Sequence, residues 1–179
     1  GEESYYIDLI CDYISQNVLS ETEKEFNQNV LYGKDVDVQT VVSTAKQFPF
    51  MGERMVVIVK EAQQLKKIEQ LESYLNNPQE STILVICHKY KSLDKRKSIY
   101  KSLSKKAVLF ESKKLYDNQV PAWIENYVTN KKYTLNPKAS HLLAEYLGND
   151  LSKVSNELDK LMIISQPNSE ITVESIERN

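Results

Sequence analysis

Glycine is scarce in this sequence, with 4 in 179 residues, and this scarcity bears on nucleotide binding. A P-loop needs Gly-x-x-x-x-Gly-Lys-Ser/Thr, so that backbone N–H groups cradle phosphate and a hydroxyl reaches the metal. Gly33–Lys34 is followed by Asp35, a carboxylate where the hydroxyl is needed, and Gln28 stands where the first glycine is needed. Residues 1–4 contain two adjacent glutamates, which would repel a triphosphate. The sequence therefore predicts that this chain hydrolyses no ATP and takes no cofactor.

Residues that carry other chemistry are also few. Cys11 and Cys87 are too few for a disulfide framework, and we interpret them as small buried hydrophobic residues in a reducing cytosol. His88 and His141 are far apart in the sequence, and no metal-ligand spacing surrounds either one. No Gly-x-Ser-x-Gly motif is present. The sequence therefore predicts a cytoplasmic binding or mechanical part without a metal site, not an enzyme.

Long apolar runs and an excess of one charge are absent as well. The longest apolar runs, such as Val56–Val59 and Ile83–Cys87, are far too short to span a bilayer. With 23 basic and 25 acidic residues, the formal net charge is −2. A globally basic nucleic-acid binder and a membrane partner are therefore both disfavoured, although a local basic face remains open.

One local basic segment is present between Lys89 and Lys106, where Asp94 is the single acidic residue. Lys97 and Lys101 are one helical turn apart and are expected to share a helix face. The segment is either a solvated surface helix or a contact for nucleic-acid phosphate or an acidic neighbouring subunit. The candidate contact residues are Lys95, Arg96, Lys97 and Lys101.

Hydrophobic periodicity predicts alternating strands and helices in the first part of the chain. The expected strands are Phe26–Tyr32, Met55–Val59, Thr82–Cys87 and Ala107–Phe110, the second and third buried. The expected helices are Tyr5–Leu19, Val38–Ala45, Ile68–Leu75 and Asp94–Leu103. Such alternation is typical of an α/β domain with a mostly parallel sheet and helices on both faces.

After Phe110 we expect no further strand. Helices are predicted at Val120–Val128, Pro137–Leu147 and Leu151–Ile164, with a last short one that Thr172 caps. The sequence therefore predicts an α/β domain at residues 1–120 and a small all-helical domain at residues 121–179. The boundary falls somewhere between residues 116 and 136, where Pro121 and a polar run mark a change of composition.

The stretch KQFPFMGERMVVIV joins a predicted helix to a predicted strand and contains large apolar residues in its turn. Phe48, Phe50 and Met51 flank Pro49 and stop at Gly52. Proline and glycine mark turns, but connections usually run over the surface, where large apolar side chains are less expected. Either these side chains pack under the turn, or the turn presents them to a partner.

Four stretches together resemble the delta subunit of the bacterial DNA polymerase III clamp loader: GEESYYID, QFPFMGERMVVIV, KSLDKR and LGNDLSKVSNELDKL. The last of these and the Phe-Met-Gly-Glu-Arg turn are the most specific; the rest is generic for the AAA+ superfamily. The resemblance implies an AAA+-like domain of the degenerate P-loop NTPase type, followed by a helical lid domain. It also implies an amino-terminal fragment that lacks the first strand and the collar domain of the family.

The resemblance implies a function as well. Such a subunit, part of a DNA polymerase holoenzyme but without catalytic residues, binds the sliding clamp and helps to open it during DNA replication. The other clamp-loader subunits hydrolyse ATP, and DNA enters the assembled complex. Phe50 and Met51 fall on the family's two clamp-binding positions, Phe48 and Pro49 shape the approach, and Arg54 falls on a basic position.

Two alternatives stay open. One is a nucleic-acid-binding module that uses residues 89–106. The other is a related inactive AAA+ partner of the delta-prime type, which is expected to carry a zinc-binding cysteine cluster or a Ser-Arg-Cys-like motif. Neither of these two features is found in the sequence.

Overall fold

The computed structural model describes residues 1–165, 169–173 and 176, and the chain divides into two compact units. The first unit is Gly1–Lys113 and the second is Lys114–Asn179. The division therefore falls a few residues before the predicted boundary at residue 120. Each unit is built around its own apolar core, so each is described by itself.

The first unit alternates helices with parallel strands. Its strands are β1 (Gln28–Tyr32), β2 (Met55–Lys60) and β3 (Thr82–Ile86). Its α-helices are α1 (Ser4–Asn17), α2 (Glu21–Asn27), α3 (Val38–Ala45), α4 (Glu72–Asn76) and α5 (Ser98–Lys106), and its short 3-10 helices are η1 (Ala62–Gln64) and η2 (Ile68–Leu71). The predicted element order is thus present up to α5.

The three strands form one parallel sheet in the order β1-β2-β3. In its register Val30 lies beside Ile58, and Ile58 beside Val85. The central strand is buried from Met55 to Val59, because its side chains alternate between two apolar layers. Val56 and Ile58 pack in the core on one face, and Val57 and Val59 pack in cores on the other.

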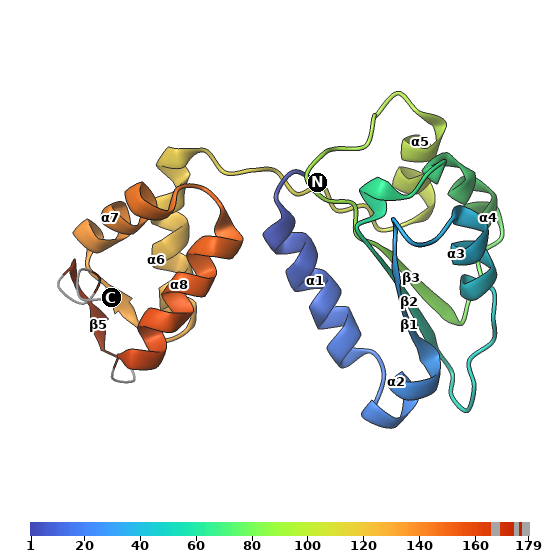
Figure 1. Ribbon diagram of the computed structural model, residues 1–179, viewed down its shortest axis with the longest axis horizontal. Helices are drawn as coiled ribbons and strands as arrows, with labels where there is room; N and C mark the ends of the chain where they lie inside the picture. Colours follow the sequence, from blue (N-terminus) through green and yellow to red (C-terminus); the bar gives the residue numbers. More distant parts are fainter. Residues whose placement is uncertain (166–168, 174–175, 177–179) are drawn as a thin grey trace. The chain divides into compact units, whose positions relative to one another are not determined.

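Helices cover both faces of the sheet (Figure 1). Cys11 of α1 packs in one apolar core with Val56 and Ile58. Val41 of α3 and Ile99 of α5 pack in another with Val59. The apolar face of each helix is therefore turned to the strands, as expected when a helix crosses between parallel strands.

The predicted strand at Phe26–Tyr32 begins too early, because its first two residues belong to α2. Ser20 caps this helix by a capping box: its hydroxyl accepts from the Glu23 N–H, and the Glu23 carboxylate accepts from the Ser20 N–H. Such a box favours helix over strand in the residues that follow. The helix extends to Asn27, and β1 starts only at Gln28.

The predicted strand Ala107–Phe110 is not formed. Val108 is fully exposed, and the sheet ends at β3 on that side. Apolar residues make a strand only where a neighbouring strand supplies ladder hydrogen bonds, and none pairs with this segment among the described residues.

As an edge strand, β3 is also only half-buried, contrary to the expectation of a fully buried strand. The helix expected at Asp94–Leu103 is α5 and starts later, at Ser98.

The second unit is built mainly of three helices around one core. They are α6 (Val120–Asn130), α7 (Pro137–Leu147) and α8 (Leu151–Ile164), preceded by η3 (Asp117–Gln119). The core contains Ile124, Val128, Leu143, Val154 and Leu158. The three predicted helices are confirmed, with α6 slightly longer than expected.

Two short strands in this unit correct the expectation that no strand follows Phe110. These are β4 (Thr134–Leu135) and β5 (Glu170–Ile171), which pair in parallel. A pair of two-residue strands has too little sequence for a period to be seen. The short helix expected after Thr172 falls partly on residues outside the described ones. Within residues 1–165, 169–173 and 176, the model contains no helix with the length and apolarity needed to cross a membrane.

Candidate functional site

The turn between α3 and β2 exposes the large apolar side chains that the sequence singled out. The side chains of Phe48, Phe50 and Met51 are 78%, 59% and 81% exposed, and Pro49 is half-buried. Burying such side chains against a partner removes apolar area from water, which is favourable. Of the two interpretations left open by the sequence, the structure supports presentation at the surface over packing under the turn.

A third aromatic side chain joins this turn from another element. The Phe26 ring, in the last turn of α2, is 55% exposed, and its centroid lies 5.5 Å from that of Phe50. Phe26, Phe48, Phe50 and Met51 are called the turn patch below. Sequence reasoning missed Phe26 because it placed this residue in a strand. The capping box at Ser20 and Glu23 marks a helix start and is the signal that predicts a helix at this residue instead.

The backbone of the turn is held by side chains of α2. Phe50 N–H donates to Asn27 Oδ1 at 2.6 Å, and Asn27 Nδ2 donates to the Phe50 carbonyl at 2.9 Å. Met51 has a φ of 51°, a left-handed conformation that costs any residue with a Cβ more than it costs glycine. A Cβ at Gly52 would lie 3.0 Å from Glu23 Oε1. The turn is thus fixed against α2, with its apolar side chains directed outward.

The basic segment 89–106 is less positive in the structure than in the sequence. Arg96 makes two hydrogen bonds to Asp94, at 3.0 and 2.9 Å. Lys95 donates to Glu111 Oε2 at 2.8 Å, and this hydrogen bond raises the pKa of Lys95 and lowers that of Glu111. Lys95 and Arg96 thus already have a carboxylate partner in the chain, with which an external anion would compete.

The remaining cations of this segment differ in whether they have a partner within the chain. Lys89 pairs with Asp8 of α1, and Lys106 donates to Asn76 at 2.6 Å. Within the described part of the chain, no ion pair involves Lys97 or Lys101. Lys97 is the N-cap residue of α5, and Lys101 lies one turn later. Of the four candidate contact residues, only these two are free to bind phosphate.

The start of α1, where a P-loop would precede a helix, carries a carboxylate. Glu3 is the N-cap of α1 and is 4% exposed, and its Oε1 accepts from the Tyr5 N–H at 2.9 Å. A helix N-terminus favours an anion, and here the chain itself supplies that anion. Gly33 follows β1 and lies close to the backbone of Glu61. A Cβ at Gly33 would be 2.4 Å from the Glu61 carbonyl oxygen. Neither glycine-containing segment forms a phosphate cradle.

Cys11 and Cys87 are buried free thiols that share one core, which confirms that they act as small hydrophobic residues. Their mutual hydrogen bond and burial raise the pKa of the Cys87 thiol, so it stays protonated. Among the described residues, no three His, Cys, Asp or Glu side chains gather as metal ligands would.

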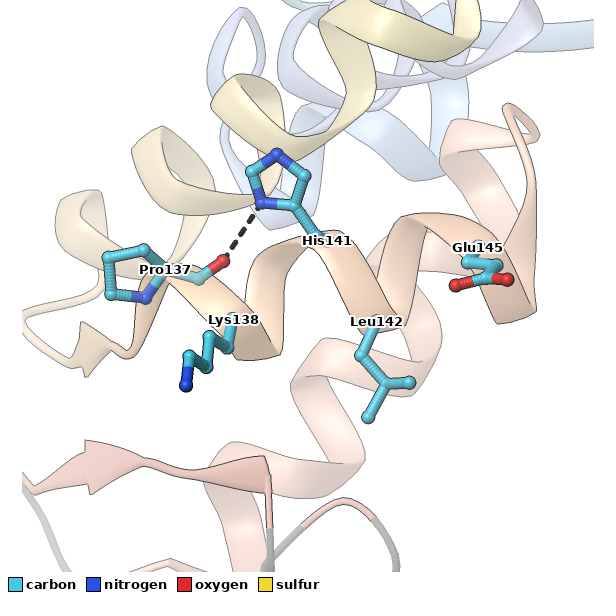
Figure 2. Close-up of a pocket in the computed structure, with 5 residues that line it drawn as sticks. All are labelled: Pro137, Lys138, His141, Leu142 and Glu145. Atoms are coloured by element: carbon cyan, nitrogen blue, oxygen red, sulfur yellow. Dashed lines mark hydrogen bonds between the residues drawn. The ribbon is translucent and has the colours of Figure 1, made fainter.

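A shallow depression of about 440 Å³ lies on α7 (Figure 2). Its lining residues all belong to this one helix: Pro137, Lys138, His141, Leu142 and Glu145. The His141 ring is held by its own helix, with Nδ1 at 2.9 Å from the Pro137 carbonyl oxygen. Side chains that stand apart along one helix surface do not converge on a ligand, so the turn patch is the stronger candidate site.

Comparisons with known proteins agree with the fold described above. The family model described as DNA polymerase III, delta subunit, matches residues 1–113. The curated DNA polymerase III subunit delta of Bacillus subtilis (strain 168) is 31% identical over 186 residues, which cover 98% of this chain and 54% of that protein. The chain therefore spans about half the length of the curated relative that it matches.

Solved structures show the same likeness. The Bacillus subtilis DNA clamp loader delta protein matches with a TM-score of 0.75 and 28% identity, over 99% of this chain and 56% of that one. A RuvB mutant from Thermotoga maritima matches with a TM-score of 0.51 over 88% of this chain and 53% of that one, at 13% identity. That second likeness shows the fold alone. Together with the flanked parallel sheet, these matches confirm the predicted α/β, AAA+-like fold.

Proposed function

Because this chain belongs to the family of the DNA polymerase III delta subunit, we propose that it is a clamp-loader subunit that binds the sliding clamp through its turn patch. In this proposal Phe50 and Met51 enter an apolar pocket on the clamp. Phe48 and Phe26 contact the rim of that pocket, and Pro49 limits the conformations of the approach. Residues 1–113 then act as the clamp-binding AAA+-like domain, and residues 114–179 act as its lid domain.

The observation that carries this proposal is the exposure of three neighbouring large apolar side chains on one turn. Exposed apolar patches on soluble domains mark interaction sites. Burial of a Phe or Met side chain is worth about 1.5–3 kcal/mol, so Phe50 and Met51 together offer roughly 3–6 kcal/mol before ordering costs. The Asn27 hydrogen bonds reduce these costs, because the backbone of Phe50 is already fixed before binding.

This burial energy is sufficient to shift a ring-shaped clamp between a closed and an open state. If the pocket on the clamp is fully formed only when one ring interface is open, binding favours the open ring by the difference in affinity for the two states. A shift of that kind needs no chemical step by this chain. Other subunits of the loader bind and hydrolyse ATP, whereas here the Glu3 carboxylate lies at the helix N-terminus that a phosphate would need.

The basic segment supports a second, additional contact. Lys97 and Lys101 make no ion pair within the described residues, and both lie at the start of α5. Within the assembled loader they are proposed to meet DNA phosphate. Lys95 and Arg96, which are engaged with Glu111 and Asp94, contribute less.

The test is the double variant Phe50→Ala/Met51→Ala, assayed for affinity to the purified sliding clamp and for melting temperature. Truncation of two central apolar residues typically costs 2 kcal/mol or more each, so affinity is expected to fall by about 10²-fold or more. The melting temperature is expected to change little, because both side chains are exposed. Wild-type affinity would refute the proposal. So would a collapsed melting temperature, since core residues cost about 3–5 kcal/mol when truncated.

A further inference from the structure

Asn27 is a buried amide whose hydrogen bonds go to the turn. It is the last residue of α2 and is 0% exposed. Its Oδ1 accepts from the Phe50 N–H at 2.6 Å, and its Nδ2 donates to the Phe50 carbonyl at 2.9 Å. One side chain thus engages both polar backbone groups of a single residue, as a neighbouring residue does across a hydrogen-bonded antiparallel pair.

The rest of the turn has little other backbone support. Within the part of the chain that the structure describes, no backbone–backbone hydrogen bond reaches residues 48–54. Gly52 also lies against the amide, since a Cβ there would be 3.2 Å from Asn27 Nδ2. The turn therefore wraps around the Asn27 side chain, and the conformation of Phe50 and Met51 depends on this amide.

From this geometry we infer that Asn27 is a positioning residue for clamp binding, an inference that rests on the proposed function. Asn27 is buried and does not touch the clamp. It keeps the turn in the one conformation that directs Phe50 and Met51 outward. If the turn adopts its binding-competent conformation for only a fraction of the time, its affinity for the clamp is the intrinsic affinity multiplied by that fraction.

The experiment compares Asn27→Ala and Asn27→Leu in this chain by affinity for the purified sliding clamp. Leucine has the same number and branching of side-chain heavy atoms as asparagine, so Asn27→Leu removes the two hydrogen bonds and leaves no cavity. If the competent fraction falls to roughly a tenth, affinity falls about tenfold in both variants. Hydrogen exchange of the Phe50 amide in the free chain is expected to accelerate, because its acceptor is lost.

The matched control is Gln28→Ala. Gln28 is the adjacent residue and also carries an amide, but its Nε2 donates to Ser15 Oγ of α1 at 3.0 Å. Loss of that hydrogen bond affects the packing of α1 and leaves the turn alone. Clamp affinity and exchange at Phe50 are therefore expected to stay at wild-type values. An equal loss in Gln28→Ala would mean that general destabilisation explains the result, and the inference would be overturned.

A double-mutant cycle separates this inference from the proposed function. The Asn27→Leu change is added to Phe50→Ala/Met51→Ala, and no further loss is expected because Asn27 acts through those side chains. A further tenfold loss would show an action independent of the turn and would overturn the inference. Wild-type binding by the Asn27 variants, with binding lost in Phe50→Ala/Met51→Ala, would overturn the inference alone. Wild-type binding by Phe50→Ala/Met51→Ala would overturn the proposed function and the inference together.

Discussion

The turn patch and the basic segment differ in how the fold treats their side chains. At the turn, a buried amide fixes the backbone and the large apolar side chains stay exposed. Along residues 89–106, charged side chains pair with acidic groups of the same chain, including Asp8, Asp94 and Glu111. One region thus keeps its large apolar side chains exposed, whereas in the other three of the eight basic residues, Lys89, Lys95 and Arg96, are paired within the chain.

This difference has a physical cause. A surface Lys or Arg can form an ion pair with a nearby carboxylate without any change in the backbone, because its long side chain is flexible. An apolar side chain on a turn has no such local partner, and it becomes buried only if the backbone bends toward the core. At this turn, two hydrogen bonds with Asn27 hold the Phe50 backbone. A charge run in a sequence therefore overstates the free charge, and an apolar turn does not by itself reveal its exposure.

The largest effect in this comparison is expected at Met51, whose φ of 51° suits asparagine better than methionine. Met51→Asn removes the apolar side chain and reduces the backbone strain at this left-handed position. Clamp affinity is expected to fall about tenfold or more, from the loss of roughly 1.5–3 kcal/mol of burial. The melting temperature is expected to hold or to rise by a few degrees.

Met51→Leu is the control, because it keeps an apolar side chain of similar volume at the same backbone position. It should bind within about threefold of wild type. A Met51→Asn chain that binds like Met51→Leu would show that the apolar side chain is not the contact. A Met51→Asn chain that melts much earlier would show instead that Met51 supports the fold.

A smaller effect is expected from the basic segment, measured as the affinity of the reconstituted clamp loader for primed DNA. Lys97→Gln/Lys101→Gln removes the two candidate contact residues that make no ion pair among the described residues. With up to about 1 kcal/mol in all for exposed charges, affinity is expected to fall roughly fivefold or less. The slope of affinity against salt should become shallower, and clamp affinity should stay unchanged.

Lys95→Gln/Arg96→Gln removes the same net charge from residues that are already paired, so a smaller loss is expected. Equal losses in the two double variants would contradict the distinction between free and paired cations. A fall in clamp affinity in either variant would place the clamp contact on the basic segment.

Much of the fold follows from the sequence because its signals are local. The apolar run of β2 and the helical spacing of α1, α3, α7 and α8 predict elements that the structure contains. The segment Ala107–Phe110 has the same apolar character but forms no strand, because strand formation depends on a neighbour that local sequence does not reveal. The early start predicted for β1 has a different origin, since the capping box at Ser20 and Glu23 is a local signal that favours a helix there.

The candidate site depends on contacts between distant residues, so less of it follows from the sequence. The residue types at the turn point to Phe48, Phe50 and Met51, but they do not decide whether these side chains are exposed. The backbone of Phe50 is hydrogen-bonded to Asn27, which lies 23 positions away. In the basic segment, Lys95 finds its partner Glu111 16 positions away. Pairings of this kind are fixed only when the chain is folded.

The most direct test of the central claim is amide hydrogen exchange of the wild-type chain, free and with saturating sliding clamp. The account predicts slower exchange at residues 48–54 when the clamp is bound, and no change at residues 94–106. The contrary result is an unprotected turn with protection along residues 94–106. It would move the clamp contact to the basic segment and refute the role assigned to Phe50 and Met51.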